Sequence, residues 1–307
     1  MSNRIAAIVV TFNRKECLQN CLISLLEQTK KVDRIFIIDN ASTDGTENFV
    51  KSTFSQFEDI EYIRLNKNIG GAGGFNYGLK TAFDNGYDYM WVMDDDGIPQ
   101  SNCLEELLNI NHKTGGEYIC SSVINQDDHD TFVFGLFDKQ NNKMIRNLND
   151  VSIYKSKGYI EGCANPFNGL LLTRNLIVRA GLPKKELFIW GDEIEYELRV
   201  INKGFKIYTA INAIHLHPVN KIKTYKLLFG KLNVSYFGEN NLRSYCYFRN
   251  RAFIYKKYFA LTKLPLFYIK YFMFFITKRN FKGIKFFLKA SHDGLNENFR
   301  KHFHYIN

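Results

Sequence analysis

The sequence contains few of the residues that stiffen or cross-link a chain. Only five of its 307 residues are proline, and its six cysteines form no CxxC pair. Scattered single cysteines argue against a disulfide framework or a zinc finger, and they are typical of reduced thiols in a cytoplasm. A hydrophobic content of 45% is enough for a folded protein with a sizeable core.

Two further absences concern membranes and targeting. The chain starts with a short apolar run that predicts a first strand, and we expect no secretory leader. The longest apolar stretch, residues 264–276, is interrupted by Lys270 and is shorter than the roughly 20 apolar residues that span a bilayer. We therefore expect a cytoplasmic protein without a membrane-spanning helix.

Charge is distributed unevenly along the chain. The net charge is +10, and the excess of Lys and Arg lies after residue 220, in a segment that is also rich in Phe and Tyr. The preceding part is mildly acidic. This change of composition predicts two domains with different partners, residues 1–220 and residues 221–307.

Alternating strand and helix patterns predict the fold of the first domain. Apolar runs rich in β-branched residues predict strands at 5–10, 34–38, 61–65 and 89–93, with helical spacing between them. Such alternation implies right-handed crossovers and an α/β fold with a mostly parallel sheet and helices on both faces. Beyond residue 220, mostly helical spacing predicts a C-terminal helical region.

The strand at 89–93 leads into three consecutive carboxylates, Asp94, Asp95 and Asp96. Like charges this close repel one another unless a cation lies between them. Acids at a strand end lie at the edge of an open sheet, where ligands bind, and hard oxygen ligands suit a divalent ion that bridges phosphates. An acidic turn that caps the next helix is the alternative. The remaining motifs favour a site for a metal and a diphosphate.

Three other motifs are expected at the same edge, because the carboxyl ends of parallel strands meet there. Asp39 would accept hydrogen bonds from a base or ribose, or else cap a turn. Residues 68–74 are rich in glycine and predict a loop before a helix from Phe75, whose backbone N–H groups approach a ligand. No Gly-Lys-Ser/Thr follows, so this is not a Walker loop. The third motif is residues 11–14.

A later acidic cluster supplies the candidate general base. Asp192 and Glu193 follow an apolar segment that ends at Trp190, and a base must lie within hydrogen-bond reach of the attacking hydroxyl. Acids at a helix start also have a purely electrostatic explanation. We expect Trp190 and Glu195 to line the acceptor site, with Glu195 orienting a neighbour such as Arg199.

Two histidines follow on one extended segment. They are His215 and His217, and we expect only one of them to reach the acidic cluster. A neutral imidazole is a common metal ligand. We favour His215 as the residue that completes the metal shell and keep His217 as the alternative.

The basic C-terminal segment mixes apolar and cationic residues at helical spacing. This pattern predicts amphipathic helices that lie on an anionic membrane surface. The alternatives are a basic helical cap packed on the core, or a surface that builds a homo-oligomer. No known nucleic-acid-binding module matches the segment, so we expect no nucleic-acid partner.

Taken together and in this order, the motifs resemble the family 2 glycosyltransferases with the GT-A fold, over roughly residues 4–218. The matching stretches are 9–14, 38–46, Asn68, 94–96 and 192–195. Within the family, residues 68–75, 91–96 and 188–196 resemble bacterial galactofuranosyltransferases. Residues 245–250 also occur in the related rhamnosyltransferases of polysaccharide assembly.

The resemblance implies a role for each matching residue. Asp94 and Asp96, with one of the two histidines, would bind Mn²⁺ or Mg²⁺. The second acid of the late pair is typically the base, and it is commonly aspartate. This chain has Glu193 there, so Asp192 also stays a candidate. The residues expected to bind the donor are Thr11, Asn13, Arg14, Asp39, Asn68, Gly70, Gly71, Trp91, Asp94 and Asp95.

The implied activity is an inverting, metal-dependent transfer of galactofuranose from UDP-galactofuranose. The acceptor would be a lipid-linked glycan at the inner face of a bacterial membrane, where the protein is peripheral, and the product a capsule or O-antigen polysaccharide. One alternative is transfer of rhamnose from dTDP-rhamnose or of a hexopyranose from a UDP-sugar. Another is a catalytically inactive scaffold that binds a sugar nucleotide.

Overall fold

The computed structural model describes residues 3–165, 167–219, 224–227, 232–239, 241–259 and 262–305. The chain divides into two compact units. Unit 1 comprises residues 1–183 and 196–219, and unit 2 comprises residues 184–195 and 220–307. The second unit therefore combines the C-terminal region with a short segment from the middle of the chain.

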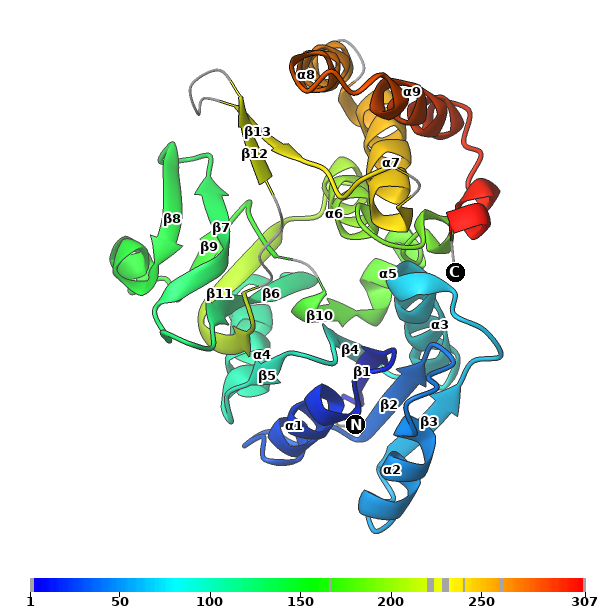
Figure 1. The fold of residues 1–307 in the computed structure, drawn as a ribbon. Helices are drawn as coiled ribbons and strands as arrows, with labels where there is room; N and C mark the ends of the chain where they lie inside the picture. The colour runs from blue at the N-terminus through cyan, green and yellow to red at the C-terminus, as the bar shows by residue number, and fades with distance from the viewer. Residues whose placement is uncertain are drawn as a thin grey trace. The chain divides into compact units, whose positions relative to one another are not determined.

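Unit 1 is built on a central sheet with four parallel strands at one side (Figure 1). β10 runs antiparallel to both of its neighbours, β4 and β6, whereas β6 and β11 are parallel. The predicted mostly parallel sheet is confirmed. In spatial order its strands are β3 (Ile60–Arg64), β2 (Arg34–Asp39), β1 (Ile5–Thr11), β4 (Tyr89–Asp94), β10 (Asn168–Thr173), β6 (Tyr118–Asn125), β11 (Ile207–His217) and β5 (Ile98–Pro99).

Three short strands and a 3₁₀ helix extend unit 1 beyond this path. They belong to the middle of the sequence, between β6 and β10. β7 pairs with β6 and β8, and β9 pairs with β11. Their bounds are β7 (Thr131–Asp138), β8 (Lys143–Asn147), η1 (Leu148–Tyr154) and β9 (Tyr159–Glu161).

Helices cover both faces of the sheet. Along β1, Ile5, Ala7 and Val9 belong to one buried core and Ala6 and Ile8 to the other, so the strand reads as a continuous apolar run. The first core includes α1 (Lys15–Leu26), α2 (Thr46–Thr53) and α4 (Cys103–Thr114), and the second includes α3 (Gly70–Asp84), α5 (Arg174–Ala180) and the part of α6 (Asp192–Asn202) after residue 195.

The glycine-rich stretch differs from the prediction, because it forms the first turns of α3 instead of a loop. A Cβ on Gly74 would lie 2.6 Å from Val10 Cγ1, and one on Gly78 would lie 2.5 Å from Ile8 Cγ2. Glycine therefore lets α3 lie directly on β1. Its low helix propensity argued for a loop, but the close approach of helix and sheet outweighs that preference.

Unit 2 is helical, as predicted for the C-terminal region, and Figure 1 shows its three long helices beside one another. Its core is aromatic: Phe248, Tyr271, Phe275 and Phe287 are fully buried. The high Phe and Tyr content thus fills a core. The elements are η2 (Lys185–Leu187), β12 (Thr224–Leu227), β13 (Leu232–Ser235), α7 (Leu242–Phe259), α8 (Lys263–Thr277), α9 (Phe281–Leu295) and η3 (Arg300–Tyr305).

None of the helices in the described part of the chain combines the length and the apolar character that a membrane crossing needs.

Candidate functional site

Three neighbouring parallel strands of unit 1 end in polar side chains. Thr11 at the end of β1 is in register with Asp39 at the end of β2, and Val10 is in register with Asp94 at the end of β4. The carboxyl ends of these strands form the edge at which open α/β sheets bind ligands. The structure therefore brings the predicted motifs to one edge.

Asp95 is the buried member of the acidic cluster and is held by two partners. Its carboxylate accepts hydrogen bonds from Thr11 Oγ1 at 2.7 Å and from Arg14 Nη1 at 3.3 Å. Burial raises the pKa of Asp95 to about 6, against the effect of these two partners. Asp95 thus ties the residues that follow β1 to the end of β4.

Asp96 and Asp94 differ in their surroundings and in the direction of their pKa shifts. Asp96 pairs with Arg14 Nη1 at 2.7 Å, and its Oδ1 lies 3.2 Å from His217 Nε2. Although burial opposes it, these partners hold the pKa of Asp96 below its ordinary value. Burial, together with repulsion from Asp96 and Asp95, raises the pKa of Asp94 well above its usual range. A cation at this point would relieve that repulsion.

The two histidines have different surroundings. His217 Nδ1 lies 2.7 Å from the carbonyl oxygen of Pro218, which leaves Nε2 directed at Asp96. His215 is fully buried, and a Cβ on Gly97 would lie only 2.0 Å from its Nε2. Within the described residues neither ring nitrogen of His215 has a hydrogen-bond partner. Burial lowers the pKa of His215 to about 3, so the ring is neutral. The geometry favours the alternative, His217, over His215 as a ligand.

The residues present suit a divalent ion only in part. Metal–ligand distances of about 2.1 Å place two neighbouring ligands about 3 Å apart, close to the separation of Asp96 Oδ1 and His217 Nε2. Over the described ranges, no group of three His, Cys, Asp or Glu side chains is already arranged as a ligand set. Carboxylates that bind Mg²⁺ or Mn²⁺ beside a substrate often leave positions for water and phosphate oxygens.

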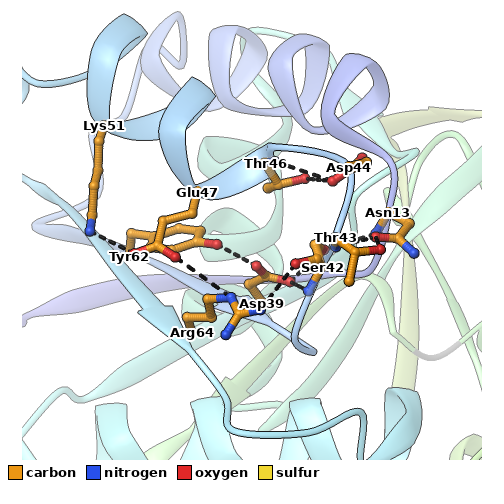
Figure 2. Close-up of polar contacts among 10 residues, drawn as sticks. All are labelled: Asn13, Asp39, Ser42, Thr43, Asp44, Thr46, Glu47, Lys51, Tyr62 and Arg64. Atoms are coloured by element: carbon orange, nitrogen blue, oxygen red, sulfur yellow. Dashed lines mark hydrogen bonds and ion pairs between the residues drawn. The ribbon is translucent and has the colours of Figure 1, made fainter.

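A hydrogen-bonded cluster surrounds Asp39 at the same edge (Figure 2). Asp39 is fully buried, and its Oδ1 accepts bonds from the backbone N–H of Ser42 at 2.9 Å and from the Ser42 hydroxyl at 2.5 Å. Its Oδ2 accepts from the Tyr62 hydroxyl. Asn13 Oδ1 accepts from the Thr43 N–H at 2.7 Å. Asp39 and Asn13 therefore shape the loop after β2, and Asp39 exposes no surface of its own.

Sequence reasoning missed Tyr62 and Arg64. Both lie on β3, where Tyr62 is in register with Ile37 and Arg64 with Asp39. Arg64 Nη2 donates to the carbonyl oxygen of Ser42 at 3.2 Å. Burial and the hydrogen bond to Asp39 raise the pKa of Tyr62 far above its ordinary value, so its hydroxyl stays protonated. The sequence could have indicated both residues, because parallel pairing of the predicted strands places the ends of β2 and β3 side by side.

The other predicted donor residues differ in accessibility. Asn68 Oδ1 accepts from the Gly70 N–H at 2.8 Å and so shapes the start of α3. Gly71 is partly exposed, and no atom lies within 4 Å of a Cβ built there. Trp91 is fully buried in the core around α1 and α4. Its ring supports the sheet beneath the site and offers no exposed surface to a donor.

The predicted base and acceptor residues lie in unit 2. Asp192 is buried, with 5% of its surface exposed, whereas Glu193 is partly exposed and its Oε2 accepts from the Gly191 N–H at 2.9 Å. Glu195 is buried and accepts from Tyr258 Oη at 2.9 Å and Lys257 Nζ at 3.3 Å. These contacts direct the Glu195 side chain toward the interior of unit 2. A residue that lines the acceptor site would instead be expected to present its side chain to the acceptor.

Trp190 and Arg199 also have defined partners. The Trp190 ring packs edge-on against Phe237, with ring centroids 4.6 Å apart, and near Tyr247. Arg199, expected beside Glu195, donates to the carbonyl oxygens of Ala180 and Leu182 at 2.7 and 3.0 Å. Its guanidinium therefore secures the end of α5.

Solved structures and characterised relatives resemble this chain. The chain is 28% identical to galactofuranosyltransferase GlfT1 of Mycolicibacterium smegmatis, over 97% of this chain and 98% of that protein. It is 23% identical to dTDP-rhamnosyl transferase RfbF of Shigella flexneri, over 71% of this chain and 70% of that protein. The mannosyltransferase PcManGT of Pyrobaculum calidifontis, solved with GDP-Man and Mn²⁺, has a TM-score of 0.54 at 18% identity over 85% of this chain and 64% of that one.

The family model described as glycosyl transferase family 2 matches residues 6–168. This range holds the strand ends, the Asp39 cluster and the acidic motif, and it is more than half of the chain. The chain therefore belongs to glycosyl transferase family 2, with the GT-A fold, and is a glycosyltransferase.

Proposed function

We propose that this glycosyltransferase is an inverting, metal-dependent enzyme that transfers galactofuranose from UDP-galactofuranose. The observation that carries the donor assignment is the similarity to GlfT1 over nearly the whole of both chains. A match of that extent includes unit 2 as well as the sheet edge. It therefore supports a shared transfer reaction as well as a shared nucleotide-binding site.

The donor would bind at the carboxyl edge of the sheet. Loop residues ordered by Asp39 and Asn13 would hold the nucleoside, with Tyr62 as an added candidate. Asn68 and the open space over Gly71 would lie beside the sugar diphosphate. Thr11 and Asp95 form a buried support for this edge, and the exposed side chain of Arg14, bonded to Asp95, brings a positive charge to the diphosphate.

Asp94, Asp96 and His217 would hold Mn²⁺ or Mg²⁺. The close pair formed by Asp96 and His217 and the raised pKa of Asp94 support this assignment. When bound, the ion stabilises negative charge on the departing diphosphate. His217 would keep its Nδ1 proton on the carbonyl of Pro218, which leaves Nε2 as the ligand atom.

Glu193 is the better candidate for the general base. It is partly exposed and binds the Gly191 N–H through Oε2 only, whereas Asp192 is buried. Glu193 would take the proton of the acceptor hydroxyl, and that oxygen would attack the anomeric carbon from the face opposite the diphosphate. The bond to the diphosphate breaks as the new bond forms, and UDP leaves with the electron pair. A single displacement of this kind inverts the anomeric configuration.

The acceptor would be a lipid-linked glycan on an anionic membrane surface, and residues 221–307 would bring the enzyme to it while residues 1–220 hold the donor. Leu266, Ile269 and Ile276 are 64%, 55% and 59% exposed on α8, a helix whose spacing puts them on one side. Lys263 and Lys270 lie on the same helix. Apolar side chains flanked by lysines suit an interface with acidic lipids.

The product would then be a capsule or O-antigen polysaccharide, made at the inner face of the membrane. A second donor has specific support, because the similarity to RfbF, described as a dTDP-rhamnosyl transferase, covers 71% of this chain. An inactive sugar-nucleotide-binding scaffold is the remaining alternative from another class.

The first experiment is a donor panel. The purified protein is incubated with UDP-galactofuranose, UDP-galactopyranose, UDP-glucose or dTDP-rhamnose, with Mn²⁺ or EDTA, and release of the nucleotide is measured with and without a lipid-linked acceptor. We expect metal-dependent turnover of UDP-galactofuranose alone. Turnover of dTDP-rhamnose alone would identify dTDP-rhamnose as the donor in place of UDP-galactofuranose. Nucleotide binding without turnover of any donor would favour the inactive scaffold.

Two aspartate variants test the metal assignment. Asp96→Ala should abolish metal-dependent transfer, while Asp127→Ala, at an exposed position of unit 1, should leave it unchanged. Full metal-dependent transfer by Asp96→Ala would refute the proposed site.

Vesicle flotation tests the membrane assignment. Leu266→Glu with Ile269→Glu should reduce binding of the full-length protein to vesicles of acidic lipids. The control is Ile153→Glu with Val178→Glu, at equally exposed apolar positions of unit 1. Equal flotation of both double variants would contradict a membrane role for α8.

A further inference from the structure

The backbone just before the candidate base is held in an unusual conformation. Phe188, Trp190 and Gly191 have φ angles of 68°, 61° and 110°. The left-handed region is disfavoured for residues with a Cβ, above all for bulky ones. A turn with three such residues among four persists only where its surroundings fix it. α6 begins directly after this turn, at Asp192.

One amide on α7 holds three carbonyl groups, one just before this turn and two within it. Asn250 Nδ2 lies 2.9 Å from the oxygen of Leu187, 2.9 Å from that of Ile189 and 2.7 Å from that of Trp190. Asn250 is fully buried. A Cβ on Gly191 would lie 3.2 Å from Asn250 Cβ, so the turn also packs closely on this side chain.

The neighbouring arginine secures both the amide and the chain before the turn. Arg249 Nε donates to Asn250 Oδ1 at 2.9 Å, which fixes the amide with its N–H groups toward the turn. Arg249 Nη2 donates to the Leu187 oxygen at 2.7 Å, and Nη1 donates to the Phe299 oxygen at 3.1 Å. The two side chains thus form one connected network.

Arg249 is fully buried, and its guanidinium meets carbonyl oxygens where a carboxylate would be expected. Within the described residues no acid lies at ion-pair distance from it. Burying a charge without a counter-ion is costly, and an apolar side chain would stabilise the fold more cheaply. The planar fork of five donors is instead suited to fixing several carbonyl groups in place.

We propose that Arg249 and Asn250 are positioning residues that hold the turn at 188–191 and thereby aim Glu193. The link is direct, since Glu193 Oε2 accepts from the N–H of Gly191, the last residue of the turn. The same turn sets the direction of Trp190. This inference rests on the proposed role of Glu193 as the base.

Asn250→Asp is the principal test. It keeps the shape of the side chain and the acceptor for Arg249, but it sets an oxygen against three carbonyl oxygens. Misplacing a reacting group by about 1 Å can cost about 100-fold, so we expect kcat of transfer to fall about 100-fold with the KM for the donor unchanged. Asn296→Asp is the control, because that exposed amide also donates to a backbone carbonyl of unit 2, at 2.9 Å.

Tryptophan fluorescence reports on the conformation of the turn independently of enzyme activity. The protein has two tryptophans, and Trp91 is fully buried. A change in acrylamide quenching therefore reports on Trp190. We expect Asn250→Asp to increase quenching and Asn296→Asp to leave it unchanged. Quenching and kcat of Asn250→Asp equal to those of the control would overturn the proposal, as would a loss of kcat matched by an equal loss of UDP affinity.

Gly191→Ala reaches the same turn by another route and serves if Asn250→Asp does not fold. It removes no hydrogen-bonding side chain, but it adds a Cβ against Asn250 and Ile254 at a φ of 110°. We expect the same loss of kcat, and an unchanged kcat would overturn the proposal. A Glu193→Gln variant that transfers sugar at the wild-type rate would refute Glu193 as the base. Acrylamide quenching of Trp190 shows, independently of that result, whether Asn250 anchors the turn.

Discussion

Two glycines of helix α3 should respond in opposite directions to the same substitution. Gly71 is partly exposed, and no atom lies within 4 Å of an added Cβ. Gly78 is buried, and its added Cβ would lie 2.5 Å from Ile8 Cγ2 and 2.9 Å from Ile38 Cγ1. Alanine is favoured over glycine in any helix, so only the difference in space separates the two positions.

The size of each effect follows from this geometry. Inserting a methyl group into a packed core costs about 1–3 kcal/mol, and Ile8 has little freedom to move, because β-branched side chains are stiff at χ1. At about 2–4 °C per kcal/mol for a unit of this size, Gly78→Ala should lower the unfolding midpoint by about 2–12 °C. Gly71→Ala should gain about 0.5 kcal/mol by restricting the unfolded chain, and should raise the midpoint by about 1–2 °C.

Thermal and urea unfolding followed by circular dichroism would measure both shifts, and donor kinetics would add a second contrast. We expect the KM for the donor to rise in Gly71→Ala, because the methyl group would enter the space assigned to the donor. Gly78→Ala, buried against the sheet, should leave that KM unchanged. Midpoints that shift in the same direction would refute the account of how α3 packs.

Three further predictions concern single side chains. His217→Ala should raise the Mn²⁺ concentration for half-maximal transfer about tenfold or more, whereas His215→Ala should lower the unfolding midpoint and leave that concentration unchanged; the reverse result would restore His215 as the ligand. Glu193→Gln, whose amide oxygen keeps the same hydrogen bond, should lower kcat about 10²–10⁴-fold with the KM for the donor unchanged, and a rate within a factor of about three of wild type would eliminate it as the base. Asp138 is buried, yet bonds from Tyr154 and its neighbours hold its pKa below the ordinary value; its contribution to stability is therefore present above about pH 4 and lost as pH falls through the lowered pKa. Urea unfolding at pH 6 and pH 3 should show a smaller difference between wild type and Asp138→Asn at pH 3, and a constant difference would contradict the assignment.

The parallel half of the sheet was predictable because its signals are local. A strand buried on both faces must be apolar at every position, as residues 5–10 are, and the acids that end β4 mark the edge where ligands bind. The antiparallel strand β10 was not predictable in the same way. It enters the sheet between β4 and β6 after a long excursion, and no local pattern records which strands it will pair with.

The choice between His215 and His217 shows a second limit. Residues two apart on a strand point to the same face, so alternation along β11 cannot say which of the two rings reaches the acidic cluster. That depends on Gly97 and Gly169, whose missing side chains make room for the ring of His215. The sequence contains both glycines, yet their nearness to the histidine arises only when β11 pairs with β5 and β6.

The segment before the candidate base depends on contacts that are more distant still. Composition marks a change near residue 220, but nothing in residues 184–195 indicates that they form one compact unit with the C-terminal helices. Each residue of the turn, taken alone, favours an ordinary conformation, and Phe188 and Trp190 reach positive φ only against that preference. The compensation comes from Arg249 and Asn250, some sixty positions later. A strained turn and the buried polar pair that satisfies it are each unfavourable alone and stable together, so the geometry around the base becomes visible only once both are placed.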